Sequence, residues 1–237
     1  MADTSLAVSI EDLRFAYPDG TEALRGIGLR VREGERLAVL GNNGAGKSTL
    51  LLHLNGLLRG SGEVCVLGLP LIRRNLAAIR RQVGLVFQNP DDQLFMPTVF
   101  DETAYAAINA GYSRDEVRQR VDEALSITGL CGLEAKHPLN LSLGQRKRLT
   151  IASVLVTDNR LLVLDEPSAS LDPAARESLI ALLGSLPSTI LVATHDLSFA
   201  SASCERGVVI EDGVVVRDGA LPELVDGCRE HRSALLG

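Results

Sequence analysis

The chain has 237 residues, of which 46% are hydrophobic, so it is long enough to bury the core of a single globular domain. Its net charge of −6 argues against nucleic acid as a partner, because proteins that bind a phosphate backbone usually carry a basic face. No apolar stretch approaches the roughly 20 residues that span a bilayer, and the first residues lack the pattern of a signal peptide, so we expect a cytosolic chain that meets a membrane only through a partner.

The first elements in chain order are strands. Apolar and polar residues alternate over residues 6–17, a turn follows at residues 18–20, and a second alternating run covers residues 27–31. Alternation with a period of two predicts half-buried strands, because successive side chains of a strand point to opposite faces. The chain therefore opens with an expected antiparallel pair.

A glycine-rich stretch follows the next strand-like run. Residues 41–49 read Gly-Asn-Asn-Gly-Ala-Gly-Lys-Ser-Thr, between the apolar run 37–40 and the helix-like run 50–54. Its glycines allow successive backbone N–H groups to point at phosphate oxygens, and the positive end of the following helix adds to that field. Lys47 is then expected to reach the β- and γ-phosphates, and the Ser48 hydroxyl to ligate Mg²⁺. This pattern predicts a nucleoside triphosphate site rather than a plain turn.

The middle of the chain changes from strands to helices. Short strands are expected at residues 63–66 and 83–87, and helices from residue 98 to about residue 129. Within the helical stretch, Ser113 and Glu116 have the spacing of a capping box, in which two side chains satisfy backbone N–H groups at a helix start. We therefore predict a helical insertion.

A second helix start lies at residues 141–145, Leu-Ser-Leu-Gly-Gln, which precede a basic run and an apolar helix. Ser142 and Gln145 again have the spacing of a capping box, so the segment could serve only to begin that helix. A helix N-terminus with Gly144 beside it is also suited to bind an anion. From these residues alone, both interpretations remain open.

Two carboxylates follow the apolar run 161–164. Asp165 and Glu166 would be delivered to the carboxyl end of a buried strand, where ligands bind in open α/β sheets. We expect Asp165 to hold Mg²⁺, directly or through water, and Glu166 to polarise the water that attacks the γ-phosphorus. The alternative is a solvated acidic turn before Pro167.

The last elements alternate between helix and strand. Asp172 followed by proline predicts a helix start, residues 190–193 a buried strand, and residues 207–216 a hairpin about an Asp-Gly turn. Strands alternating with helices predict a parallel α/β sheet.

The order of these motifs resembles the ATPase cassette of ABC transporters over nearly the whole chain. The resemblance rests on the phosphate loop, Gln88, residues 141–145, the acidic strand end, the run Ser170-Leu-Asp172, and His195. It implies an α/β fold of the P-loop NTPase (RecA-like) class, with a parallel-sheet core, an N-terminal antiparallel β subdomain and a helical insertion. It also implies one ABC ATPase domain over residues 1–237, with the helical subdomain at approximately residues 90–145.

The resemblance implies a role for individual residues. Catalysis is expected from Glu166, His195, Gln88 and Lys47, with His195 contacting the γ-phosphate. ATP is expected to contact Tyr17, which would stack on adenine, and Gly41, Asn42, Asn43, Gly44, Ala45, Gly46, Lys47, Ser48 and Thr49. Mg²⁺ is expected on Ser48, Gln88 and Asp165. Considered singly, Tyr17 could be an ordinary strand aromatic, Gln88 a polar strand end and His195 a structural residue.

The same resemblance implies contacts with a second subunit. Its ATP would be clamped by the signature loop, Ser142, Leu143, Gly144 and Gln145, while Asp172 would touch its phosphate loop. The family's usual signature has two adjacent glycines, whereas Leu143 stands before Gly144 here. Ser142 and the Gly144 amide are retained, so the clamp is expected to work, but Leu143 bears on how closely the subunits approach.

Residues 86–95, Val-Phe-Gln-Asn-Pro-Asp-Asp-Gln-Leu-Phe, resemble the ATPase subunits of energy-coupling-factor transporters, particularly the cobalt branch. This implies an ATP- and Mg²⁺-dependent homodimer at the cytoplasmic face of a membrane, with a transmembrane coupling subunit and a substrate-binding membrane subunit. The expected cargo is cobalt or a related metal ion, and residues 88–93 are expected to receive a helix of the membrane subunit. The alternatives are a vitamin importer of the same type, a soluble ABC ATPase outside transport, and a nucleotide-gated scaffold without turnover.

Overall fold

The computed structural model describes residues 5–230, and for residues 226–230 the secondary structure only. Its first sheet is antiparallel, with the strand order β2-β1-β4-β5. Its strands are β1 (Leu6–Ala16), β2 (Glu22–Arg32), β4 (Ser61–Val66) and β5 (Leu69–Pro70). The antiparallel pairing of β1 with β2 confirms the strands predicted from the alternating residues.

The second sheet has six strands in the order β10-β9-β3-β8-β7-β6. They are β3 (Arg36–Leu40), β6 (Val83–Val86), β7 (Leu161–Asp165), β8 (Thr189–Thr194), β9 (Arg206–Glu211) and β10 (Val214–Ala220). All neighbours pair in parallel except β9 and β10, which form the predicted hairpin. Because the strands are parallel, the loops after β3, β7 and β8 leave the sheet at one edge.

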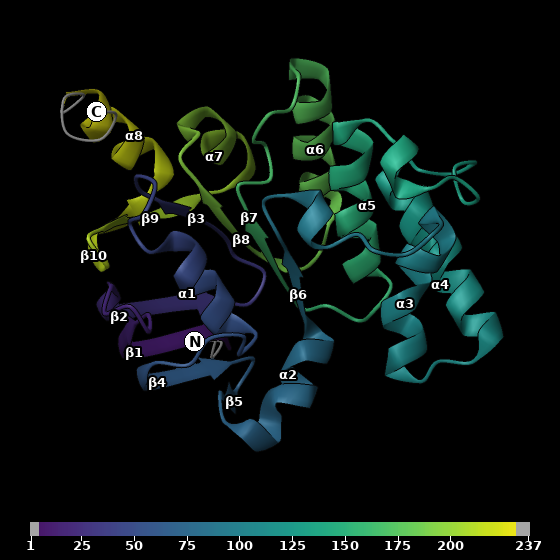
Figure 1. Cartoon of the computed structure of the whole chain (residues 1–237). Helices are drawn as coiled ribbons and strands as arrows, with labels where there is room; N and C mark the ends of the chain where they lie inside the picture. The colour runs from purple at the N-terminus through teal and green to yellow at the C-terminus, as the bar shows by residue number, and fades with distance from the viewer. Residues whose placement is uncertain (1–4, 231–237) are drawn as a thin grey trace.

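The central strands β3, β7 and β8 are apolar except at their ends, as expected for a sheet with both faces covered. Helix α1 (Lys47–Leu54) lies between the two sheets, and its buried leucines share a core with Leu37 and Val39 of β3. The alternate residues Ala38 and Leu40 face a second core. Helices that contribute to that second core are α5 (Leu143–Leu155), α6 (Pro173–Ser185), α7 (Leu197–Ser203) and α8 (Leu221–Glu230). Figure 1 shows these layers.

A third core lies among helices away from the antiparallel sheet. Helices α3 (Val99–Ala110) and α4 (Arg114–Thr128) pack against α5 around Val121, Leu125 and Leu149. The capping boxes predicted at Ser113 and Ser142 are both present. The remaining short elements are η1 (Arg73–Asn75), α2 (Leu76–Gln82), η2 (Pro90–Asp92) and η3 (Pro138–Asn140). Helix α5 thus belongs to two cores at once.

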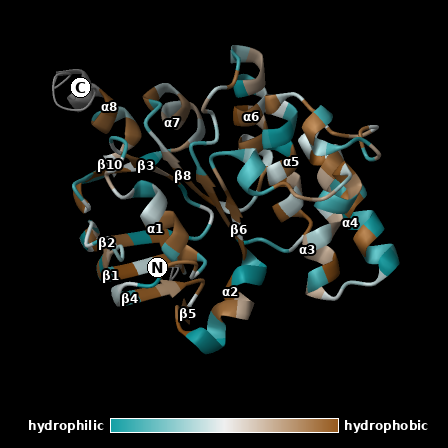
Figure 2. Ribbon diagram, in the orientation of Figure 1, coloured by the Kyte–Doolittle hydropathy of each residue, from teal (hydrophilic) through white to brown (hydrophobic). Residues whose placement is uncertain are grey.

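The hydropathy of the ribbon follows this layering. Figure 2 shows the strands inside the six-stranded sheet as hydrophobic, whereas α4 carries both hydrophobic and hydrophilic residues along its length. None of the helices within residues 5–230 combines the length and the apolar character that crossing a bilayer would require.

Candidate active site

The phosphate loop joins β3 to α1 in a conformation that requires glycine at two points. Gly41 has φ of 148° and Gly46 has φ of 105°. A Cβ atom on Gly41 would lie 2.3 Å from the carbonyl oxygen of Ile210, and one on Gly46 would lie 2.5 Å from that of Ala23. The loop is therefore pressed against two neighbouring strands, which holds its backbone at the start of α1.

Lys47 lies inside this loop and is only 5% exposed. Its Nζ donates to the carbonyl oxygens of Gly41 at 2.7 Å and of Asn42 at 3.0 Å. It also lies 3.8 Å from Oε1 of Glu166. The ammonium group is therefore held between the loop and the carboxylate, at the edge of the sheet where the strands end.

Asp165 ends β7 beside the phosphate loop. Burial raises the pKa of its carboxyl group and the charge of Glu166 adds to this, whereas the Ser48 hydroxyl and Lys47 act in the opposite direction. Its Oδ1 is buried and has no hydrogen-bond partner within residues 5–230. An orphaned buried carboxylate oxygen is costly unless a ligand uses it, and oxygen atoms are what Mg²⁺ prefers. Asp165 and Ser48 therefore fit a magnesium ion.

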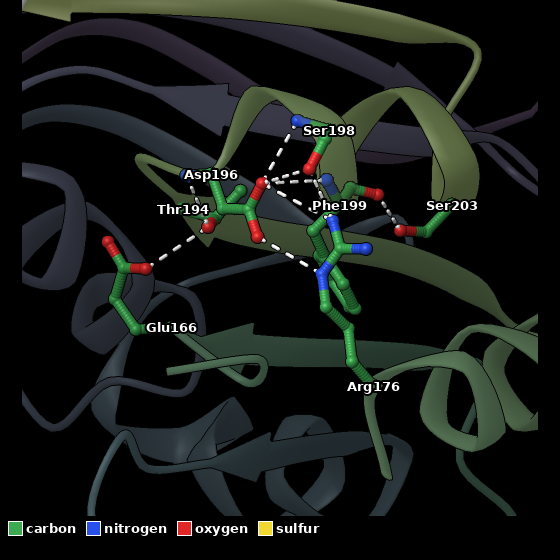
Figure 3. Close-up of polar contacts among 7 residues, drawn as sticks. All are labelled: Glu166, Arg176, Thr194, Asp196, Ser198, Phe199 and Ser203. Atoms are coloured by element: carbon green, nitrogen blue, oxygen red, sulfur yellow. Dashed lines mark hydrogen bonds and ion pairs between the residues drawn. The ribbon is translucent and has the colours of Figure 1, made fainter. Parts of the chain in front are cut away.

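Glu166 follows Asp165 and is buried. Its Oε1 accepts a hydrogen bond from the backbone N–H of His195 at 3.1 Å and lies 2.9 Å from Nδ1 of that imidazole. Its Oε2 accepts from the Thr194 hydroxyl at 3.1 Å, as Figure 3 shows. Because a carboxylate only accepts, the imidazole contact is a hydrogen bond when Nδ1 carries the proton. Residues at the end of β8 thus fix the carboxylate that follows β7.

The Glu166 contacts continue into a polar network that the sequence did not indicate. The Thr194 hydroxyl accepts from the N–H of Asp196, whose carboxylate pairs with Arg176 of α6 at 3.2 Å. Burial of Asp196 raises the pKa of its carboxyl group, but hydrogen bonds from Phe199, Ser198 and Arg176 outweigh burial and lower it. The network joins Glu166 to the helix that begins after Asp172.

Tyr17 lies close to the helix that follows the phosphate loop. Its hydroxyl is 3.0 Å from Oγ1 of Thr49, and its ring meets Phe15 edge to face at 5.0 Å. Phe15 in turn meets the buried His53 ring edge to face, also at 5.0 Å. The Tyr17 side chain is 36% exposed, so its ring is supported from within and accessible from outside.

The signature residues lie at the start of α5. The Ser142 hydroxyl accepts from the Gln145 N–H, and the Gln145 side chain accepts from the Ser142 N–H. Within residues 5–230, no hydrogen bond or ion pair joins Gln88, Ser142 or Asp172 to the phosphate loop. The structure therefore brings Lys47, Asp165, Glu166 and His195 together, and among the described residues it gives Gln88, Ser142 and Asp172 no polar contact with the phosphate loop.

Residues after Gln88 contact α5 instead. Gln88 itself is exposed, whereas Gln93 accepts from the Phe87 N–H and donates to the Thr150 carbonyl oxygen. Asp91 forms an ion pair with Arg146 of α5 at 2.5 Å. These contacts tie the segment after β6 to the helix that carries the signature residues.

Comparison with known proteins agrees with this arrangement. The sequence model of the ABC transporter family matches residues 24–169. The energy-coupling factor transporter ATP-binding protein EcfA of Methanocaldococcus jannaschii is 43% identical over 235 residues, which cover 97% of this chain and 84% of that protein.

Two solved structures share the fold over most of their length. The structure of cbiO1 from Clostridium perfringens, part of the ABC transporter complex cbiONQ, has a TM-score of 0.86 and 38% identity, covering 96% of this chain and 94% of that one. The ATP-binding cassette MJ0796, in a dimeric post-hydrolysis state bound to ADP and Pi, has a TM-score of 0.81 and 29% identity, covering 90% and 98%.

Proposed function

The chain belongs to the ABC transporter family, a family of ATP-binding subunits, and from this premise we propose that it hydrolyses ATP to drive an energy-coupling-factor importer for cobalt or a related metal ion. The observation that carries the proposal is the cluster at the ends of β3, β7 and β8. Lys47 supplies a buried positive charge, Asp165 an unpartnered oxygen, and Glu166 a fixed carboxylate.

In the proposed reaction, the residues mainly position charge. Lys47 and the loop N–H groups hold the phosphates, Glu166 accepts a proton from the attacking water, and His195 contacts the γ-phosphate. Mg²⁺ held by Ser48, Asp165 and Gln88 would neutralise phosphate charge. To act in this way, Lys47 exchanges its bonds to the carbonyl oxygens of Gly41 and Asn42 for phosphate oxygens.

The unit that hydrolyses ATP is proposed to be a homodimer. Ser142 and the Gly144 amide lie at a helix start, where N–H groups suit an anion, and we infer that they serve the nucleotide of a second subunit. Asp172, the N-cap of α6, would contact the opposite phosphate loop. The dimeric state of the related cassette MJ0796 supports this assembly.

A membrane subunit is proposed to dock beside the segment after β6. Phe95 is 65% exposed and meets Tyr105 of α3 edge to face, and Ile108 of the same helix is 60% exposed. Asp92, in the same segment after β6, adds an exposed acidic group. This chemistry suits a partner helix with apolar and basic residues, and it would place the chain at the cytoplasmic face of a membrane. That cbiO1 is part of the ABC transporter complex cbiONQ supports the proposed partners. The cobalt cargo is proposed from the resemblance of residues 86–95.

The test separates the reaction from the cargo. Phosphate release from ATP by the purified chain, abolished by EDTA and restored by Mg²⁺, is expected if the chain is an ATPase; ATP binding without release would favour the scaffold. Complexes with their co-purified membrane subunits are then reconstituted and supplied with labelled cobalt or a labelled vitamin. Uptake of the vitamin alone would make this a vitamin importer, and absence of membrane subunits would favour an ATPase outside transport.

A further inference from the structure

Lys147 is a buried lysine that none of the proposed steps uses. It lies in the second turn of α5 and is 6% exposed. Its Nζ donates to the backbone carbonyl oxygen of Glu166 at 3.1 Å, its one hydrogen bond within the described part of the chain. Burial lowers its pKa to about 8, although the charge of Glu166 acts to raise it. A buried ammonium group is unfavourable for stability, so its position calls for another explanation.

The backbone of Glu166 is in a conformation that needs support. Its φ of 43° lies in the left-handed region, which residues other than glycine seldom adopt. The N–H of Glu166 donates to the carbonyl oxygen of Ala193 at 2.8 Å, and its carbonyl oxygen accepts from Lys147 and from the N–H of Ala169 at 3.2 Å. Lys147 is therefore the side chain that holds the carbonyl group of Glu166, while Ala193 of β8 holds its N–H group.

The same helix start carries the signature residues. Gly144 lies against α6, because a Cβ atom built on it would be 3.0 Å from Cβ of Ala175. Helix α5 thus contacts the segment after β7 at two points, through Gly144 and through Lys147. Its first turns hold both the group offered to a second subunit and the donor that reaches Glu166.

We propose that Lys147 is a positioning residue that holds the Glu166 carboxylate of its own subunit in place and ties it to the signature helix. The helix that serves one nucleotide through Ser142 thereby supports the carboxylate that acts on the other nucleotide. The inference rests on the proposed function, since it needs both hydrolysis and a dimer.

The first test replaces Lys147 by methionine, which keeps the length of the side chain and removes the donor. The turnover number is expected to fall by about 10- to 100-fold with little change in KM, because a misplaced general base slows the chemical step and leaves ATP binding intact. The unfolding temperature should stay the same or rise, since a buried charge is removed. The exposed lysine in Lys136→Met is the matched control and should leave turnover unchanged.

Lys147→Gln, which restores an N–H donor, is expected to recover part of the lost turnover. Wild-type turnover in Lys147→Met would overturn the inference, as would a loss of turnover that a lowered unfolding temperature accounts for. A Lys147→Gln variant no better than Lys147→Met would also overturn it. If wild type itself released no phosphate from ATP, the proposed function would fail instead, which keeps the two failures distinct.

Mixed dimers then test which carboxylate Lys147 supports. When Lys147→Met and Glu166→Gln are in the same subunit, one ATP-hydrolysing site is inactivated, and the other subunit keeps both Lys147 and Glu166. Placing them in different subunits impairs both sites. Our inference expects the second arrangement to be slower, by about the same factor as the single variant. Equal rates, or a slower first arrangement, would overturn it.

Discussion

Oε1 of Glu166 lies 2.9 Å from Nδ1 of His195, at the ends of two neighbouring parallel strands. The same oxygen accepts from the His195 N–H and lies 3.8 Å from Nζ of Lys47. The carboxylate thus has its place set by backbone and side chain together, and small changes at this one group should be felt in turnover.

We expect Glu166→Gln to retain ATP binding and to lose hydrolysis by about 100-fold or more, because the amide keeps the size of the side chain but cannot act as a base. In this variant ATP should trap a dimer, since closure needs the γ-phosphate and reopening needs its loss. Phosphate release and light scattering measure the two effects. Phosphate release near the wild-type rate would show that Glu166 is not the general base. A variant that stays monomeric with ATP would contradict an ATP site shared between two subunits.

Lys47→Ala should weaken ATP binding itself. Hydrogen bonds to charged groups contribute about 1.5–3 kcal/mol each, so affinity should fall by about 10- to 100-fold. Calorimetry on the variant and on Lys136→Ala, which changes an exposed lysine, provides the comparison. Equal affinities in the wild type and Lys47→Ala would mean that the ammonium group does not contact the phosphates.

Gly144→Ala should impair the dimer more than the fold. The added Cβ would be 3.0 Å from Cβ of Ala175, so the start of α5 must shift against α6. We expect weaker ATP-dependent dimerisation in the Glu166→Gln background, measured by light scattering. Gly184→Ala is the matched control, because nothing lies within 4 Å of that position. A Gly144→Ala variant that dimerises like the control would show that the position of α5 is unimportant.

Asp92→Lys should uncouple uptake from hydrolysis. Asp92 is exposed, whereas Asp91 is already paired with Arg146 of α5. The charge of Asp92 can therefore be reversed without disturbing α5, but the charge of Asp91 cannot. Transport by the reconstituted complex is expected to fall several-fold while the ATPase activity of the isolated chain stays near wild type. Normal transport by the variant would place the docking surface elsewhere.

Stability should fall as the pH drops below about 6.5 because of His53. Burial lowers the pKa of this imidazole from its ordinary value of 6.5, so between the two values the unfolded chain binds a proton that the folded chain does not. Unfolding free energy therefore rises with pH through this window. His53→Leu should flatten that part of the dependence of unfolding free energy on pH, as measured by urea unfolding at several pH values. An unchanged slope would show that other groups cause the pH dependence.

Local elements could be predicted from sequence because their causes lie within a few residues. The capping boxes at Ser113 and Ser142, the turn in the β9–β10 hairpin and the strand before the phosphate loop each depend on short spacings. The sequence also predicted that Lys47 and Asp165 lie close together, because the parallel strands that precede them end at the same edge of the sheet.

Contacts between distant segments depended on the tertiary structure. Nothing in the basic run after Gln145 distinguishes Lys147, which is buried on the Glu166 carbonyl, from Arg146, which pairs with Asp91. The two differ by one helical position, a rotation of about 100° around the axis. Which side faces the sheet is decided by how α5 packs between its two cores, and packing of that kind sums many weak contacts that no short stretch of sequence contains.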